Sequence, residues 1–466
     1  MSGAADRTAL PDDPGAVATF AGFAVRELTV NPGAELSGYP FVDRRATGVH
    51  DRLRAVAMVA GEGPGRVALV GLDLIAAGAG LVRDARERIA AAVAIPGDRV
   101  MIAATHTHSG PAMGLGRLFD DGVVGTPDLA FERHVVDAIV AAVSGAAASS
   151  VPVRLVMGRA PVDPPVGGNR RRPDGYTDPT VTVLAAFDDA SRLAGMVVGM
   201  GMHPTVLQAD NLLVSGDLAW GVRSAIETRL ADSPPCLQVT GAAGDQSTRL
   251  TLAAATPDEA YRLRERAAAA VAAAVPRLAA RPAPTGACRI GASRRMIELP
   301  VRTLPPVADA EAADAGARAG LERARQEGAP VATQRTAEVV AFGTRHTLRY
   351  ARLHERQPYP ASVPAEVQAF AIGGIAIVGI PVELFAGSGR DLLERSPHAP
   401  LLVAYANDLL GYAPPRSAYL EGGYEPTVTL LAEGACDRLL DAAEETLREA
   451  TTAAAARPRP APAVPE

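Results

Sequence analysis

Two histidines directly after a short apolar run are residues whose types and spacing suit metal binding or acid–base chemistry. Residues 99–114 read RVMIAATHTHSGPAMG, so that His106 and His108 lie between apolar residues and the turn signal Gly110-Pro111. The apolar run predicts a buried strand that ends at this turn. Strand ends in open α/β sheets commonly bind ligands, and strand alternation would place both imidazoles on one face. The pair indicates either a ligand-binding site or two buried histidines that form hydrogen bonds within the core.

The same arrangement recurs at three other predicted strand ends. His203 follows one strand, Glu383 follows another, and a tyrosine-rich loop over residues 407–424 follows a third. A catalytic zinc site needs three nitrogen or oxygen ligands and a position left for water. Such ligands are normally distant in sequence and converge at strand ends. The pattern fits a zinc site, while four polar strand ends in a large sheet also arise by chance.

The elements that must position these residues alternate between short apolar runs and longer segments with helical spacing. Strands are predicted over residues 20–30, 53–59, 67–70, 100–104, 151–157, 181–187, 193–202, 237–240, 366–380 (a pair that turns at Gly373-Gly374) and 401–405. Helices are predicted over residues 81–93, 131–143, 218–230, 257–275, 308–327 and 427–450. This order indicates the α/β class, with mixed β-sheets flanked by helices.

One catalytic domain is expected over residues 20–450. Residues 1–19 are predicted to be a flexible N-terminus, and the Ala/Pro/Arg-rich residues 451–466 a disordered tail. The proline-rich segment 276–284 is the best candidate for a subdomain boundary.

Composition excludes several classes of partner. A net charge of −6 gives no electrostatic reason to expect nucleic acid or an anionic membrane. No segment approaches the roughly eighteen consecutive apolar residues of a membrane span. The first residues lack the basic start and apolar run of a secretory signal, so a cytoplasmic location is expected. Cys236, Cys288 and Cys436 are far apart, so no disulfide framework is expected.

Five longer motifs occur in order along the chain, and the histidine pair belongs to the first. They read ATHTHSGPAMG, GMHPTVLQADNLLVSGDLAW, GAAGDQS, GIPVELFAGSGRDL and NDLLGYAPPRSAYLEGGYE, and residues 36–57 read LSGYPFVDRRATGVHDRLRAVA. This series resembles the neutral/alkaline, non-lysosomal ceramidase family from about residue 20 to about residue 450. The resemblance implies a ceramidase-like catalytic domain with one Zn²⁺ per chain, which cleaves an N-acyl amide bond.

The resemblance also implies a ligand set for the zinc ion. Matched residue by residue, the family's ligands fall on His106, His203, Glu383 and Tyr412, the last by aligning NDLLGY with the late tyrosine motif. Leu409 stands where the family often has an earlier tyrosine. Zinc held in this way lowers the pKa of a bound water towards about 7 and polarises the amide carbonyl, so attack by zinc-bound hydroxide is expected.

Two basic residues are expected beside the ligands. His108 would face the same cavity and donate to the carbonyl oxygen or protonate the leaving amine, the alternative being that it only orients the turn. Arg170, in GGNRRRP, matches an arginine that reaches the site and holds substrate oxygens. The adjacent Arg171 and Arg172 are expected to be solvated.

Two hydroxyl residues also match. Ser247, in GDQS, aligns with a serine considered as a nucleophile, but the next two residues depart from the family, so a substrate-binding or water-orienting role is expected. Tyr424, in GGYE, aligns with a late tyrosine whose hydroxyl would stabilise the oxyanion, and Tyr419 is a weaker candidate.

The substrate and three alternatives stay open. Family members that hydrolyse ceramide usually carry a C-terminal β-sandwich domain and are commonly secreted or membrane-associated, so the sequence predicts a short member. A small-molecule acyl amide is the expected substrate, and the choice between ceramide and another amide stays open. The alternatives are a metal-independent serine hydrolase that uses Ser247 and a histidine, a non-catalytic relative that binds an acyl ligand, and a hydrolase of peptide-like amides, esters or lactones in specialised metabolism. The sequence indicates no particular oligomeric state.

Overall fold

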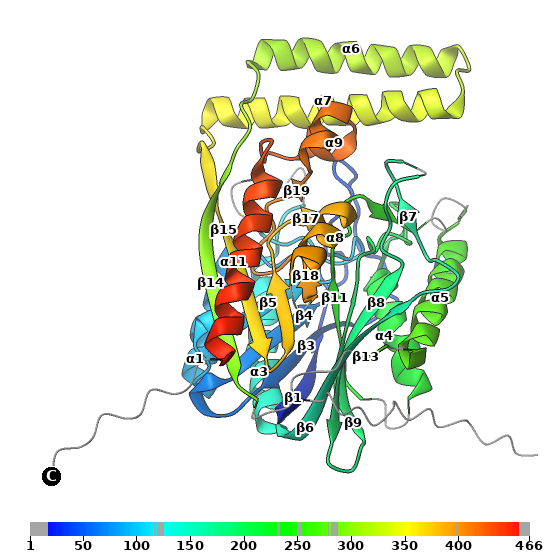
Figure 1. Ribbon diagram of the computed structural model, residues 1–466. Helices are drawn as coiled ribbons and strands as arrows, with labels where there is room; N and C mark the ends of the chain where they lie inside the picture. Colours follow the sequence, from blue (N-terminus) through cyan, green and yellow to red (C-terminus); the bar gives the residue numbers. More distant parts are fainter. Residues whose placement is uncertain are drawn as a thin grey trace, which may run out of the picture.

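Two β-sheets packed face to face form the centre of the protein (Figure 1). The computed structural model describes residues 17–115, 118, 125–172, 174–230, 234–248, 254, 256–277, 279–280, 288–396 and 399–455. Its mixed sheets and flanking helices confirm the predicted α/β class.

The larger sheet is formed by residues before position 281. Within the described chain it has nine strands, in the order β11 (Cys236–Thr240), β9 (Leu193–Met200), β8 (Thr180–Asp188), β6 (Val151–Pro161), β1 (Val17–Leu28), β3 (Leu53–Ala60), β4 (Val67–Leu72) and β5 (Val100–Ala104), with β13 (Ala279–Ala280) also paired to β6. The β11–β9 and β4–β5 pairs are parallel, and the other neighbours are antiparallel.

The smaller sheet follows in sequence. Its described strands are, in order, β14 (Ile290–Pro300), β15 (Ser362–Ile372), β16 (Ile375–Gly379) and β18 (Leu401–Val403), of which only the last pair is parallel. Apolar side chains of both sheets, such as Met58, Phe370 and Ile377, form one cluster between them. Because each buried apolar side chain of this size contributes about 1.5–3 kcal/mol, this cluster is a main source of the association between the sheets.

Helices cover the outer faces of both sheets. On the larger sheet, α3 (Leu129–Ala148) packs on β1 and β3 with α1 (Ala79–Val93) beside it, and α4 (Asp217–Arg229) and α5 (Pro257–Ala274) share an apolar cluster with β8, β9 and β11. On the smaller sheet, α11 (Ala435–Ala455) lies along β14 and β15, as the red helix in Figure 1 shows. A strand such as β5 is therefore buried on both faces, which explains its unbroken apolar run.

The ends of β5, β11 and β18 meet at one place. The hydroxyl of Thr240 donates to the carbonyl of Thr105 at 2.8 Å, and the amide of Ala404 donates to the carbonyl of Thr240 at 2.8 Å. An isolated bridge pairs Ala103 with Ala406. These bonds place the chain segments that leave both sheets beside one another.

Short paired segments hold the loops around this place. In the described residues they are β2 (Gly48–Val49) with β10 (Leu213–Val214), β7 (Gly168–Asn169) with β12 (Gln246–Ser247), and β17 (Glu383–Leu384) with β19 (Tyr412–Ala413). The helix α8 (Ala386–Arg395) follows β17. Each pair joins segments that are distant in sequence.

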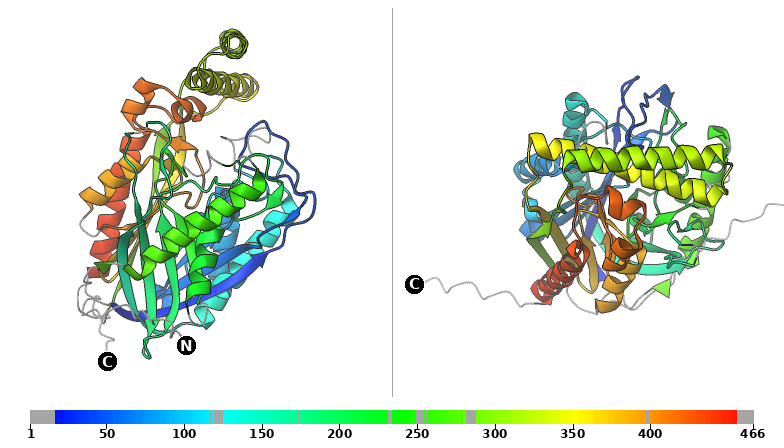
Figure 2. Two further views of the ribbon diagram at one scale, coloured as in Figure 1. Left: turned by 90° about the vertical axis from the view of Figure 1, so that its right-hand side faces the viewer. Right: turned by 90° about the horizontal axis from the view of Figure 1, so that it is seen from above.

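A helical hairpin of α6 (Val307–Gln326) and α7 (Val331–Arg356) lies above the sheets (Figure 1). Seen from above, it crosses the top of the molecule (Figure 2). The inner helix, α7, packs on α10 (Tyr424–Val428), which follows α9 (Arg416–Glu421). The predicted charged surface helix over residues 308–327 corresponds to α6.

Several elements differ from the sequence predictions. The strand β14 and the helix α7 were not predicted, because charged residues interrupt their apolar patterns. The helix predicted from residue 427 begins at Ala435, since Leu431 bridges to Val301 and the chain before it forms α10. It continues to Ala455, into the predicted disordered tail, whose other residues lie outside the described chain.

The N-terminal and boundary predictions are only partly covered by the structure. β1 begins at Val17, three residues inside the segment predicted to be flexible, and residues 1–16 lie outside the described chain. Residues 278 and 281–284 of the predicted boundary also lie outside it, so the domain division stays a prediction.

Two predictions on the chain as a whole can be compared directly. Among the described helices, none combines the length and apolarity needed to cross a membrane. Cys236, Cys288 and Cys436 are free thiols, as the cysteine spacing predicted.

Candidate metal and active site

His106 lies in a turn after β5, not on the strand. Its φ of +66° is left-handed, so the predicted strand alternation between His106 and His108 is wrong. The backbone amide of His106 donates to the carbonyl of Leu74 at 2.9 Å, and its Nδ1 lies 2.8 Å from the carbonyl of Ile75. Because a carbonyl only accepts, Nδ1 carries the proton and Nε2 keeps its lone pair. The Nε2 atom is therefore prepared to bind a cation.

The three imidazoles of His106, His108 and His203 converge. The Nε2 atom of His108 lies 3.2 Å from Nε2 of His106 and 3.1 Å from Nε2 of His203. His203 is fully buried, and its Nδ1 lies 3.3 Å from the carbonyl of Ala243, which fixes the same tautomer as in His106. These three side chains form a buried group whose ligand atoms suit one metal ion.

Glu383 brings a carboxylate from β17, which follows β16 of the smaller sheet in the chain. Its Oε2 atom lies 3.3 Å from Nε2 of His106 and 4.0 Å from Nε2 of His203. The same oxygen is buried and accepts no hydrogen bond from the described residues. A buried carboxylate oxygen without a partner is costly, and a bound cation would remove that cost.

The spacing of these atoms fits a tetrahedral metal ion. Ligands about 2.0–2.1 Å from zinc lie roughly 3.3 Å from one another at the corners of a tetrahedron. Three of the four separations described above are between 3.1 and 3.3 Å, and the other is 4.0 Å. The chemistry and spacing of this donor set therefore fit zinc.

Burial keeps two of the imidazoles neutral. Burial first, and then the charge of His106 and of nearby arginines, hold the pKa of His108 and of His203 well below the usual histidine range. A metal binds the neutral imidazole, so these environments favour the form that acts as a ligand or as a proton acceptor.

Tyr412 lies next to Glu383 on the paired strands β17 and β19. Its hydroxyl accepts a hydrogen bond from Nη2 of Arg170 at 3.1 Å. Burial and then the charge of Glu383 raise the pKa of Tyr412 well above the usual tyrosine range. The phenol is therefore protonated, and its hydroxyl is available beside the histidine group.

Arg170 lies beside Tyr412, and its predicted contact with substrate oxygens stays a prediction. Its Nε donates to Glu425 at 2.8 Å, and its Nη2 donates to the carbonyl of Gly244 at 2.8 Å as well as to Tyr412. Its guanidinium also lies 5.7 Å from the centre of the Tyr424 ring. All these contacts are to the protein, so Arg170 positions the two tyrosines.

Arg171 is not solvated, against the prediction. Its side chain is 11% exposed, and it pairs with the second oxygen of Glu425 at 2.6 Å. Burial alone would raise the pKa of Glu425, but Arg170 and Arg171 lower it below its usual range. Arg172 is exposed and pairs with Asp174, as expected for a solvated residue.

The two late tyrosines have different positions. Tyr424 lines the pocket described below, and its ring lies 5.9 Å from that of Tyr412. Burial raises the pKa of Tyr424, which keeps its hydroxyl a donor. The hydroxyl of Tyr419 instead donates to the carbonyl of Leu431 at 2.9 Å, away from the site.

Ser247 lies on β12, where it pairs with Gly168 of β7. It is not among the described residues that line the pocket, whereas His106, His108 and Glu383 are. Its predicted roles stay predictions, and its place favours support of the loop that carries Arg170.

Two glycines allow the close packing of this site. A Cβ atom at Gly244 would lie 2.6 Å from the carbonyl oxygen of Glu383. A Cβ atom at Gly38 would lie 2.4 Å from the ring of His108, and Gly38 has a φ of +102°. Only glycine fits where the backbone approaches a functional side chain so closely.

Sequence reasoning missed Tyr405. Its ring stacks on that of His106, with centres 4.1 Å apart and planes 21° apart, and its hydroxyl is buried with no partner among the described residues. It ends the predicted strand over residues 401–405, and only its aromatic type at a polar strand end could have drawn attention to it.

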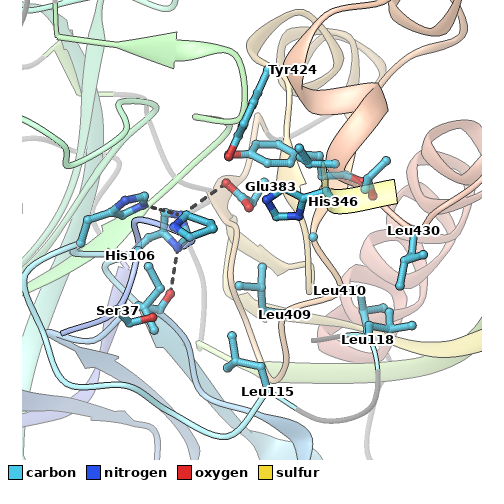
Figure 3. A pocket seen from close by; sticks show the side chains of 18 of the residues that line it. Ser37, His106, Leu115, Leu118, His346, Glu383, Leu409, Leu410, Tyr424 and Leu430 are labelled. Carbon is cyan, nitrogen blue, oxygen red and sulfur yellow. Dashed lines mark hydrogen bonds and ion pairs between the residues drawn. The ribbon is translucent and has the colours of Figure 1, made fainter. Parts of the chain in front are cut away.

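A pocket opens beside the histidine group (Figure 3). It holds about 680 Å³ of empty space, including its open mouth, and His106, His108, Glu383, Tyr412 and Tyr424 lie along one part of it. The rest of its wall is largely apolar and includes Ile75, Leu115, Leu118, Leu409, Leu410 and Leu430. Such a pocket suits a ligand with a hydrocarbon chain and one reactive polar group.

His346 of α7 also lines this pocket, and it was not predicted. Its side chain is 2% exposed, and both ring nitrogens are without a hydrogen-bond partner in the described part of the chain. Burial, followed by the charges of Arg302, Arg345 and Arg349, lowers the pKa of His346 to about 3.

This pKa predicts how stability depends on pH. The unfolded chain binds the His346 proton with a pKa of about 6.5, above that of the folded protein. Above about pH 6.5 the imidazole is neutral in both states and does not change the free energy of unfolding. As the pH falls toward 3, the unfolded chain binds the proton and the folded protein does not, so the free energy of unfolding falls. We expect the free energy of unfolding to fall more steeply in the wild type than in His346→Leu below about pH 6.5, by up to about 1.4 kcal/mol per pH unit.

Denaturant titrations of both proteins between neutral pH and about pH 4.5 measure this difference. Parallel stability curves would show that His346 does not titrate as its surroundings imply.

Comparisons with known proteins identify related sequences and related folds. Residues 29–233 match the family described as neutral/alkaline non-lysosomal ceramidase, N-terminal. A neutral ceramidase of Pseudomonas aeruginosa is 31% identical over 206 residues, which are 39% of this chain and 29% of that protein. The alignment thus spans less than a third of the relative's length.

Solved structures extend the likeness over nearly the whole chain. The crystal structure of neutral ceramidase from Pseudomonas aeruginosa has a TM-score of 0.71 at 20% identity, covering 97% of this chain and 77% of that one. A ceramidase complexed with C2 has a TM-score of 0.68 at 20% identity, covering 93% and 75%. Over residues 29–233 the sequence is thus similar to the neutral/alkaline non-lysosomal ceramidase family, and the chain shares the fold of the solved ceramidases.

Proposed function

We propose that the protein is a zinc-dependent amidohydrolase that cleaves a linear N-acyl amide bond in a small-molecule substrate, as a ceramidase does. The convergence of three imidazoles with the unpartnered oxygen of Glu383, at the side of a largely apolar pocket, carries this proposal. The names of the related proteins support the amide and the acyl chain.

In this proposal His106, His203 and Glu383 hold one zinc ion, and His108 or Tyr412 supplies the next donor. The bound ion would polarise the amide carbonyl and acidify a water molecule. Both His106 and His203 have their Nδ1 atoms bound to backbone carbonyls, so they hold their rings in place without further movement.

The surrounding residues bind and orient the substrate. The apolar wall takes the acyl chain, and the protonated hydroxyl of Tyr424 donates to the carbonyl oxygen as charge develops there. His108, when it is not a ligand, would accept a proton from the attacking water and pass it to the nitrogen of the leaving amine. Arg170 holds Tyr412 and positions the Tyr424 ring.

Removal of the metal tests this proposal. Dialysis against a chelator should lower amide hydrolysis by at least about a hundredfold, and added Zn²⁺ should restore it, because the ion supplies both the polarisation and the nucleophile. Ser247→Ala should keep most of the activity. Zinc content and hydrolysis of short- and long-chain N-acyl amides are measured on the same samples.

The opposite pattern would support a serine hydrolase, with Ser247→Ala inactive and the chelated protein active. Bound zinc without hydrolysis of any acyl amide would keep the metal site and reject the amidase. Esters and lactones in the same panel test the remaining alternative, which uses the same site.

A further inference from the structure

The unpartnered imidazole of His346 is a polar point in an otherwise apolar part of the pocket wall. It stands on α7, above the leucines of the wall, and Figure 3 shows it and His106 on opposite sides of Glu383. Neither ring nitrogen bonds to the described residues, although the ring is 98% buried. Burial of an unpaired donor and acceptor is destabilising, so stability does not explain why residue 346 is a histidine.

The side chains around His346 fix its ring but form no hydrogen bond with the ring nitrogens among the described residues. The rings of Phe342 and Phe41 have their centres 4.6 and 4.7 Å from that of His346, and they fix its orientation. Arg302 donates to Thr347, and Arg345 lies over the Phe41 ring, so both cations are engaged beside it. The imidazole is thus held between two aromatic rings, is uncharged, and forms part of the pocket wall.

A neutral imidazole offers one donor and one acceptor, which is the complement of a hydroxyl group. We propose that His346 is a specificity residue, which hydrogen-bonds a hydroxyl group of the substrate close to the scissile amide. The protein therefore selects acyl amides that carry such a hydroxyl over those with hydrocarbon in its place. The selection during hydrolysis rests on the function proposed above, but the binding preference does not.

Matched pairs of amides test this. One pair is N-decanoylethanolamine and N-decanoylpropylamine, in which a methyl group replaces the hydroxyl on the amine side. The other is N-(α-hydroxydecanoyl)propylamine and N-decanoylpropylamine, which differ on the acyl side. Values of kcat/KM are measured for the zinc-loaded protein, and dissociation constants are measured by calorimetry for the metal-free protein.

The wild type should prefer the hydroxylated member of at least one pair by about tenfold or more, because a site built for a hydroxyl is left unpaired by its analogue. His346→Leu should bring this ratio close to one, and His346→Gln, which keeps a donor and an acceptor, should retain most of it. His354→Leu is the control on the same helix, since His354 instead accepts from the amide of Tyr359.

The outcomes separate the two proposals. A ratio near one in both pairs for the wild type, or a preference that survives in His346→Leu, overturns the role of His346. A binding preference that His346→Leu removes, in a protein that hydrolyses none of the amides, supports His346 and rejects the amidase. The melting temperature of His346→Leu should rise, which shows that a lost preference does not come from misfolding.

Discussion

Replacing His203 with alanine is expected to remove bound zinc and to lower kcat/KM for amide hydrolysis by at least about a thousandfold, or about 4 kcal/mol. The ring of His203 is fully buried and lies 3.1 Å from His108 and 4.0 Å from Glu383. Its loss leaves at most an incomplete ligand set, which binds zinc weakly. Elemental analysis gives the zinc content, and initial rates give kcat/KM.

His134→Ala is the matched control, because His134 accepts a hydrogen bond from the amide of Thr29 at an exposed position and is not among the residues that line the pocket in the described chain. It should keep one zinc ion per chain and full activity. A His203→Ala protein that retains either the zinc ion or the activity would show that His203 is not a ligand.

The variant His108→Gln separates the two roles of His108. Bound zinc is lost if His108 is a ligand, and only the rate of hydrolysis falls if His108 transfers a proton.

Replacing Arg170 with methionine is expected to lower kcat/KM by about a hundredfold and to destabilise the fold by a few kcal/mol. Arg170 holds the hydroxyl of Tyr412, the carboxylate of Glu425 and the carbonyl of Gly244. Without it, Tyr412 loses this donor, and the buried Glu425 keeps Arg171 as its cationic partner among the described residues. Thermal unfolding and steady-state kinetics measure both effects.

Arg172→Met is the control, since it removes the same charge two residues away. Arg172 is exposed and pairs with Asp174 on the surface, where ion pairs contribute little. Its kinetics and melting temperature should equal those of the wild type. Equal losses in the two variants would point to a general effect of the loop and not to the contacts of Arg170.

The sequence predicted the strands that carry the site because their apolar runs are buried on both faces. The run before His106 and the run before His203 end where the structure ends β5 and β9, within a few residues. The helix α7 escaped prediction because arginines recur along it and hide its narrow buried stripe. Its contribution to the pocket depends on a tertiary contact with α10, which has no sequence signal.

For the site, the sequence indicated which residues lie together but not the backbone geometry and contacts that bring them together. The histidine pair was predicted to share a strand face, yet a left-handed residue at His106 turns the chain and still brings the two Nε2 atoms to 3.2 Å. Arg171 was assigned to solvent because adjacent arginines usually are exposed. Only the fold shows that Glu425 lies within its reach.

The junction where β5, β11 and β18 end has a thermodynamic consequence for the whole molecule. His106 and His203 leave the larger sheet there, while Glu383 and Tyr412 come from the segment that follows the smaller one. An ion bound by both groups would act as a clamp between the two halves of the fold, and its binding energy would add to the energy of their docking. Occupancy of the site and cohesion of the two sheets are then one coupled equilibrium.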